Sequence, residues 1–189
     1  MRHRPPLLLL LLLLLALPAC FQLREPEPAI ATSEWLQPTQ IDILLANFVA
    51  AVQRLNPANY ERVFSGADYR FTPDPTSAGS ASAVFTNWST PDELTYFNGL
   101  RRRSAAGTAN TLVFSDRTDN FFTADSAEVS ARYVLRIAQQ DTAFRPAQVQ
   151  GNIRLVVRRR SNEWRIVRWR DQRTSAAPCW TDVKKYFVR

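Results

Sequence analysis

Several residue types that support common chemistries are scarce in this chain. Among its 189 residues are one histidine, two cysteines and five glycines, and the glycines are not clustered. A glycine-rich phosphate-binding loop is therefore excluded. Two cysteines without a CxxC pair also exclude a disulfide scaffold and give no sign of structural zinc. We expect neither a metal nor a cofactor.

The composition is otherwise that of a folded, basic protein. Hydrophobic residues make up 46% of the chain and charged residues 22%, which excludes a disordered or collagen-like chain. The length fits one domain with a short additional segment. The formal net charge is +7, and arginine carries most of the positive charge because only Lys184 and Lys185 are lysines.

Residues 1–19 have the pattern of a secretory signal peptide. Arg2 and Arg4 precede nine leucines, from Leu7 to Leu15, and small residues follow. The apolar run is about a dozen residues long, whereas a membrane-spanning helix needs ~20. We therefore expect residues 1–19 to be removed on export rather than to remain as a membrane anchor.

The end of this segment, Leu17-Pro18-Ala19-Cys20, resembles a bacterial lipobox, although Pro18 is not the small residue usual at its position. In such signals the chain is cut before the cysteine, which then carries acyl chains. Each buried methylene contributes ~0.8 kcal/mol to membrane binding, so more than one chain gives stable attachment. We predict a lipidated Cys20; the alternative is an ordinary signal peptide with a chance cysteine.

A lipidated Cys20 places the protein in the cell envelope. Phe21 is not the aspartate that some lipoprotein systems use as a retention signal, so we expect an anchor in the outer membrane, facing the periplasm. Residues 20–38 contain three prolines and read as a tether. The mature chain would lack His3, the only histidine, which excludes catalysis by imidazole.

Residues 39–189 read as one domain. Apolar residues first recur at threes and fours, which predicts helices, and later alternate with polar residues, which predicts strands. The alternation slips after Ile166, which predicts a bulge near Val167 and Arg168. The expected helices span 39–55, 57–65 and 90–103, and the expected strands span 69–72, 112–114, 128–137, 149–158 and 164–171.

Three further segments complete the order. Residues 76–83 are small and polar and read as a loop, and Thr90-Pro91-Asp92-Glu93 reads as a capping box. Residues 179–187 predict a short amphipathic helix or an extended arm. This order predicts an α+β domain in which a curved antiparallel sheet wraps around helices, a cone with a pocket at its wide end.

The element order and the motif Trp164-Arg165-Ile166 followed by Trp169-Arg170-Asp171 resemble the nuclear transport factor 2-like (SnoaL-like) superfamily. The resemblance implies a cystatin-like cone, and such folds host isomerases, dehydratases and pure binding modules alike. Further segments resemble uncharacterised bacterial exported lipoproteins of that superfamily: Asn59-Tyr60, Tyr69 to Pro75, Trp88, Tyr96-Phe97 and Cys179-Trp180.

The resemblance also implies that an enzyme of this group would hold a carboxylate or tyrosine inside the cone. Asp68, Tyr133 and Asp171 are the catalytic candidates, since a buried carboxylate facing a tyrosine could act as acid or base. The alternative interpretation makes Tyr133 a core residue and pairs Asp171 with an arginine. The residues expected to line a ligand pocket are Phe71, Trp88, Tyr133, Trp169 and Asp171.

Four arginines are predicted to share one face of the sheet. Arg132 and Arg136 occupy polar positions of one strand, and Arg154 and Arg158 occupy those of the next. Such a face could hold an anionic partner, such as lipid headgroups, acidic glycans or another envelope protein. Alternatively, it is a solvated face that acidic residues such as Glu128 balance.

Three functions follow as hypotheses. The preferred one is a lipid-anchored cell-envelope protein that binds a small ligand or a protein without turnover. The alternatives are a periplasmic isomerase or dehydratase with a carboxylate–tyrosine pocket, and a structural or assembly lipoprotein that docks through the arginine-rich face. Expected partners are the membrane, through Cys20, and a small apolar ligand or an envelope protein. We expect no nucleic acid, and dimerisation is left open.

Overall fold

The structure, a computed structural model, describes residues 35–105 and 110–189, which belong to one compact unit. The predicted signal peptide, Cys20 and most of the predicted tether lie outside the described residues. Within the described part, no helix is long and apolar enough to cross a membrane.

The helices are α2 (Ile41–Gln53), α3 (Pro57–Arg62), α4 (Pro75–Ala78), α5 (Thr90–Arg102) and α6 (Trp180–Phe187), with short 3-10 helices η2 (Gly66–Asp68) and η3 (Gly79–Phe85). The strands are β1 (Arg70–Thr72), β2 (Thr111–Thr123), β3 (Ser126–Arg136), β4 (Gln148–Arg160) and β5 (Glu163–Gln172).

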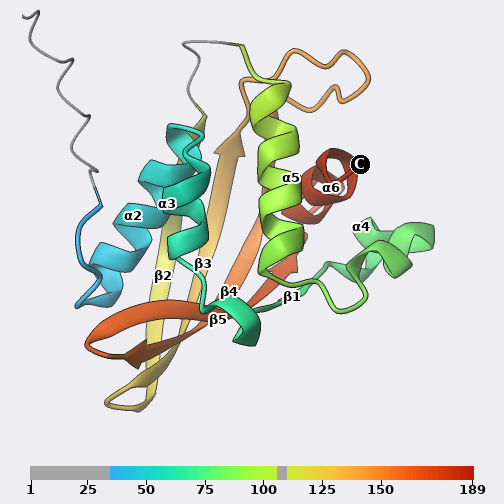
Figure 1. The fold of residues 1–189 in the computed structure, drawn as a ribbon. Helices are drawn as coiled ribbons and strands as arrows, with labels where there is room; N and C mark the ends of the chain where they lie inside the picture. The colour runs from blue at the N-terminus through green and yellow to red at the C-terminus, as the bar shows by residue number, and fades with distance from the viewer. Residues whose placement is uncertain (1–34, 106–109) are drawn as a thin grey trace, which may run out of the picture. The chain divides into compact units, whose positions relative to one another are not determined.

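The five strands form one sheet in the order β1-β5-β4-β3-β2. β1 runs parallel to β5, and the other neighbours are antiparallel. Figure 1 shows α2, α3 and α5 on one face of the curved sheet, with α6 beside α5. Inward side chains of the strands and the apolar faces of these helices form one core. The predicted α+β fold, with helices first and long strands last, is confirmed.

The last long strand contains the predicted bulge. Val167 has no partner on β4, because the register between the two strands shifts between its neighbours Ile166 and Arg168. The extra residue changes which side chains point inward. As a result both Trp164 and Trp169 reach the core, where they are 4% and 0% exposed.

The segment expected to be a loop is helical. Asp74 accepts a 2.8 Å hydrogen bond from the backbone N–H of Ser77 and caps α4, with Pro75 at the first helical position. Helix η3 continues from there to Phe85. A capping carboxylate followed by proline starts a helix even where the next residues are small and polar, which the loop interpretation overlooked.

The cap of helix α5 lies one residue before the expected one, Thr90. Ser89 is the cap, and its backbone N–H and its hydroxyl donate to Oδ2 of Asp92 at 2.9 and 2.8 Å. Glu93, which we expected to close the capping box, is fully buried in the core. The shift of one position therefore directs a carboxylate into the interior.

Candidate functional site

The C-terminal helix α6 packs beside α5 and places Trp180 in the core of the cone. The Trp180 indole stacks on Phe48, with ring centroids 5.8 Å apart and planes inclined by 14°. It also meets the edge of Trp169 at 4.7 Å and the ring of Tyr133 at 5.3 Å. The side chain is fully buried. An aromatic side chain of the chain itself thus lies where the sequence led us to expect a hollow.

Two catalytic candidates, Tyr133 and Asp171, lie in direct contact beneath this helix. The Tyr133 hydroxyl donates to Oδ1 of Asp171 at 2.7 Å and accepts from the backbone N–H of Trp180 at 2.6 Å. Oδ2 of Asp171 accepts from the backbone N–H and the hydroxyl of Thr181 at 2.6 and 2.7 Å. Both carboxylate oxygens are therefore engaged in fastening the first turn of α6 to the sheet.

Burial controls the protonation of this pair. It raises the pKa of Asp171, and the hydrogen bonds from Thr181 and Tyr133 oppose that rise. The pKa of Tyr133 is raised well above its ordinary value by burial, and further by the neighbouring carboxylate of Asp171. Tyr133 is therefore a hydrogen-bond donor at neutral pH and fits the structural interpretation of this contact.

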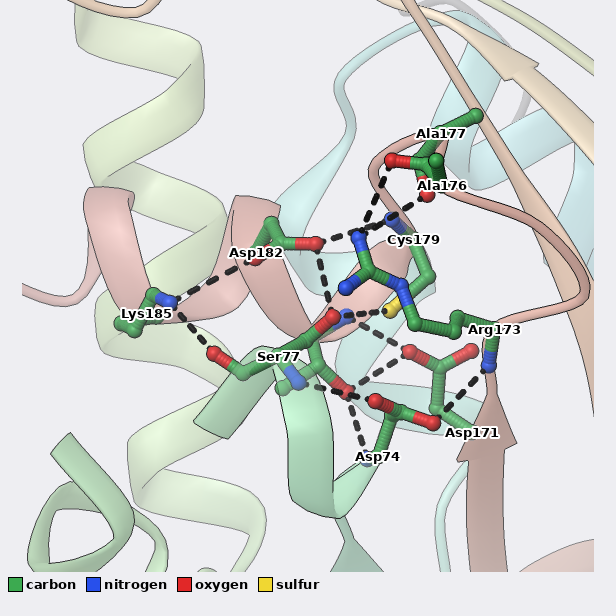
Figure 2. Close-up of polar contacts among 10 residues, drawn as sticks. Asp74, Ser77, Asp171, Arg173, Ala176, Ala177, Cys179, Asp182 and Lys185 are labelled. Atoms are coloured by element: carbon green, nitrogen blue, oxygen red, sulfur yellow. Dashed lines mark hydrogen bonds and ion pairs between the residues drawn. The ribbon is translucent and has the colours of Figure 1, made fainter. Parts of the chain in front are cut away.

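Helix α4 and its cap hold the same end of α6, as Figure 2 shows. The backbone N–H of Asp74 donates to the Thr181 hydroxyl at 2.9 Å, and Asp182 accepts the Ser77 hydroxyl at 2.9 Å. Burial raises the pKa of the Cys179 thiol to about 12, so this cysteine is not a ready nucleophile. In the described part of the chain, no group of three or more potential ligands could hold a metal ion.

A buried ion pair, which the sequence analysis missed, lies between α5 and α6. Lys184 donates to Oε1 of Glu93, and both side chains are fully buried. The carboxylate also accepts the hydroxyls of Tyr60 at 2.9 Å and Tyr69 at 2.6 Å, and the indole N–H of Trp88 at 2.8 Å. With four donors around it, the charge of Glu93 is fully compensated.

Lys184 lies against aromatic rings. Its Nζ is 3.8 Å from the ring centroid of Phe71 and 3.7 Å from that of Trp169. Burial lowers the pKa of Lys184 to about 8, although the nearby Glu93 acts in the opposite direction. One signal in the sequence could have revealed this site. Lys184 lies on the apolar side of the last helix, with Trp180 and Val183, whereas a lysine is expected on the exposed side.

The residues predicted to line a ligand pocket form part of the packed core. All five are at most 5% exposed, and Phe71 meets Trp88 and Trp169 at ring distances of 5.9 and 5.5 Å. Asp68, the third catalytic candidate, lies elsewhere. It is half exposed and forms a 2.7 Å ion pair with Arg160, so it is not inside the cone.

The outer face of the sheet carries the arginines that the alternation predicted. Arg132, Arg136, Arg154 and Arg158 are all exposed there, and Arg154 pairs across the strands with Arg170 of β5. Three more exposed arginines join them, which the sequence analysis did not place. We call the resulting set the arginine face: Arg70, Arg132, Arg136, Arg154, Arg158, Arg168 and Arg170.

Only one of the missed arginines, Arg70, depends on long-range strand pairing. Arg70 of β1 lies opposite Arg168 of β5. A parallel pairing between segments about a hundred residues apart leaves no local pattern in the sequence. Arg168 and Arg170 lie on β5, beside the preceding strand β4, and flank the buried Trp169. The local alternation that follows the bulge was the signal that could have placed these two on the outer face.

Two adjoining hollows open on the arginine face. One has a volume of about 760 Å³ and the other about 400 Å³, and they share Thr72, Arg154 and Arg170 as lining residues. Arg168 lines the smaller one. Arg154, Arg168 and Arg170 form no ion pair with another residue in the described ranges. Three guanidinium groups thus face solvent without a carboxylate partner.

No protein-family model matches the chain, and no curated protein matches it. Solved structures do match. A nuclear transport factor 2-like (NTF2-like) superfamily protein from Salmonella enterica aligns with a TM-score of 0.56 and 10% identity, over 72% of this chain and 91% of its own. A protein of unknown function with a cystatin-like fold from Nostoc punctiforme aligns with a TM-score of 0.52 and 13% identity, over 73% and 91%. The described domain has the NTF2-like, or cystatin-like, fold.

A third structure of this NTF2-like fold bears the name of an enzyme. It comes from Novosphingobium aromaticivorans, has a provisional assignment as a scytalone dehydratase, and aligns with a TM-score of 0.57 and 14% identity over 74% of this chain and 89% of its own. At such identities the similarity concerns the fold alone. Because the NTF2-like fold is shared by named enzymes and by proteins of unknown function, the site has to decide the function.

Proposed function

We propose that this chain is a lipid-anchored envelope protein whose NTF2-like domain binds an anionic partner on its arginine face without turnover. Cys20 would carry the lipid, and residues 21–34 would connect it to the domain. The observation that carries the proposal is the contrast between the two faces of the sheet. The inner face is covered by side chains of the chain itself, whereas the outer face presents unpaired guanidinium groups beside open hollows.

The packing of the cone supports a role without catalysis. A catalytic carboxylate needs a position where a substrate atom can approach it. The oxygens of Asp171 are taken by Tyr133 and Thr181, and those of Glu93 by four donors from the core. An enzymatic role would require α6 to move and to give up the contacts of Thr181 with Asp171 and of Lys184 with Glu93.

The chemistry of the arginine face supports an anionic partner. A guanidinium group presents a planar fork of N–H donors that matches carboxylate, sulfate and phosphate oxygens. Arg154 lies directly opposite Arg170, so two like charges are neighbours in the free protein. An anion placed between such neighbours removes their repulsion and gains hydrogen bonds from both.

Binding to heparin, a sulfated polyanion, tests this surface. We expect Arg154→Gln/Arg168→Gln/Arg170→Gln to bind immobilised heparin about tenfold more weakly than the unaltered protein at 0.1 M salt, which corresponds to ~1.4 kcal/mol. The matched control, Arg101→Gln/Arg102→Gln/Arg145→Gln, removes the same charge from exposed positions elsewhere. Equal weakening in both variants would show that only net charge matters and would contradict the proposed site.

The anchor needs a separate test. Mass spectrometry of the protein purified from membranes should find a mature chain that begins at Cys20 with acyl groups attached. Cys20→Ser should release the protein into the soluble envelope fraction. A free, unmodified N-terminus in the unaltered protein would overturn the proposed anchor. The proposed binding surface would not be affected, because the heparin experiment tests it separately.

A further inference from the structure

Two large apolar side chains are exposed at one end of the sheet. Phe121 and Phe122, near the turn between β2 and β3, are 62% and 61% exposed. Phe121 meets Trp164 of β5 edge to face, with ring centroids 6.3 Å apart, but most of its side chain stays exposed. Figure 1 shows this hairpin extending past α2 and α3. The hairpin tip is therefore an apolar projection that Trp164 covers only in part.

Basic side chains accompany this projection. Arg158 is exposed and lies opposite Ser126, the first residue of β3. Arg159 forms a 2.6 Å ion pair with Asp125 in the hairpin turn itself. Aromatic side chains next to arginine are the combination that suits the boundary between the acyl chains and the anionic headgroups of a bilayer.

A second copy of the chain is the less favoured occupant of this end. Edge-to-edge pairing needs a regular strand with a free backbone edge. The register of β2 is instead interrupted twice, between Ser115 and Thr118 and between Phe121 and Thr123. Charged side chains also occupy this part of the strand, and Arg117 is held by Asp119. These features obstruct strand pairing but leave the tip free to enter a fluid surface.

We propose that the β2–β3 hairpin tip contacts the bilayer, with Phe121 and Phe122 at the level of the acyl chains and Arg158 at the headgroups of anionic phospholipids. The inference rests on the lipid anchor proposed above, which would keep the domain close to the membrane. Fourteen residues separate Cys20 from Trp35, and at ~3.5 Å per residue they reach about 50 Å. The anchor thus permits the contact without enforcing it.

Fluorescence quenching tests the contact on the full-length mature protein. Phe122→Cys introduces one accessible thiol, because Cys179 is buried and Cys20 would carry lipid. A bimane label is attached there, and the protein is placed in vesicles of phosphatidylglycerol and phosphatidylcholine with brominated acyl chains. The matched control label is at Gln148→Cys, an exposed position at the start of β4, the opposite end of the sheet.

We expect at least twofold stronger quenching at position 122 than at position 148. Adding Phe121→Ser should reduce the quenching at 122 at least twofold. Val113→Ser, which removes an apolar side chain of similar exposure from the other end of β2, should leave the quenching at 122 unchanged. Protein retained by the vesicles but equally quenched at both positions would overturn the bilayer contact alone. Protection of 122 from solvent quenchers without quenching by bromine would indicate a protein partner and would also overturn it. Failure of the vesicles to retain the protein would overturn the anchor and this contact together.

Discussion

The ammonium group of Lys184 lies within hydrogen-bonding distance of the Glu93 carboxylate. Both groups are buried in the core, where no solvent reaches them. Each charge depends on the other, because an isolated buried charge is far less stable than a compensated one. The pair also joins α5 to α6. It is therefore a buried polar link between α6 and the helices that cover the sheet.

Neutralising one member of this pair should destabilise the fold. We expect Glu93→Gln to lower the free energy of unfolding by roughly 3–5 kcal/mol, because Lys184 would have to keep its charge buried without a counterion or give up its proton on folding. Urea denaturation followed by tryptophan fluorescence measures the change. The double variant Glu93→Gln/Lys184→Met should recover more than half of the loss. A double variant no more stable than Glu93→Gln would contradict this explanation.

Stability should rise with pH on the alkaline side. Burial lowers the pKa of Lys184 in the folded state to about 8 from 10.5, so between these values the unfolded chain binds more protons than the folded one. The free energy of unfolding therefore increases with pH in this window, by about 1 kcal/mol from pH 8 to pH 9. Urea denaturation at pH 8 and at pH 9 measures this difference in the free energy of unfolding. The variant Lys184→Met lacks the titrating group and should lose this rise.

The upper limit of that window is set by tyrosines. The pKa values of Tyr60 and Tyr69 are raised well above 10 by burial and by Glu93, so above pH 10 the unfolded chain loses protons that the folded chain keeps. Stability should then fall as the pH rises further. A protein whose stability declines steadily from pH 8 would contradict the sign expected for Lys184.

The tyrosine hydroxyl that links Asp171 to α6 should be structural. We expect Tyr133→Phe to lower the free energy of unfolding by about 2 kcal/mol, since a buried carboxylate and a backbone N–H each lose a partner. Hydrogen exchange at Trp180 and Thr181 should accelerate. Tyr186→Phe removes a hydroxyl that bonds to Asp141 at a partly exposed site and should cost less than about 0.5 kcal/mol. Equal losses in the two variants would refute the special role of Tyr133.

The arginines that we propose for binding should contribute little to folding. Arg154→Gln/Arg170→Gln should change the free energy of unfolding by less than about 0.5 kcal/mol, because neither side chain has a carboxylate partner in the described residues. Arg117→Gln should cost about 1 kcal/mol, since Arg117 bonds to both Asp42 and Asp119. Thermal denaturation compares the variants. A large loss on removing Arg154 and Arg170 would assign them a structural role.

Local sequence patterns were sufficient for most of the secondary structure. The spacing of apolar residues located α2 and α5, and Asn56 followed by Pro57 located α3, where Asn56 accepts the Asn59 N–H at 3.1 Å. The change of apolar phase after Ile166 revealed the bulge. The loop predicted at residues 76–83 was wrong because a single cap, Asp74, decides between a loop and a helical turn there.

The sequence by itself determined the α+β fold, the bulge, the inward positions Trp180, Val183 and Phe187 of the last segment, and four members of the arginine face. It left a helix and an extended arm open for that last segment, which is the helix α6. These features depend on periodicities of two and 3.6 residues, which any short window displays. Only the tertiary structure decided that Trp180 of α6 stacks on Phe48, that Glu93 meets Lys184, and that β1 adds Arg70 to the outer face. Those contacts join residues that are about 90 to 130 positions apart, and chain topology rather than local spacing brings them together.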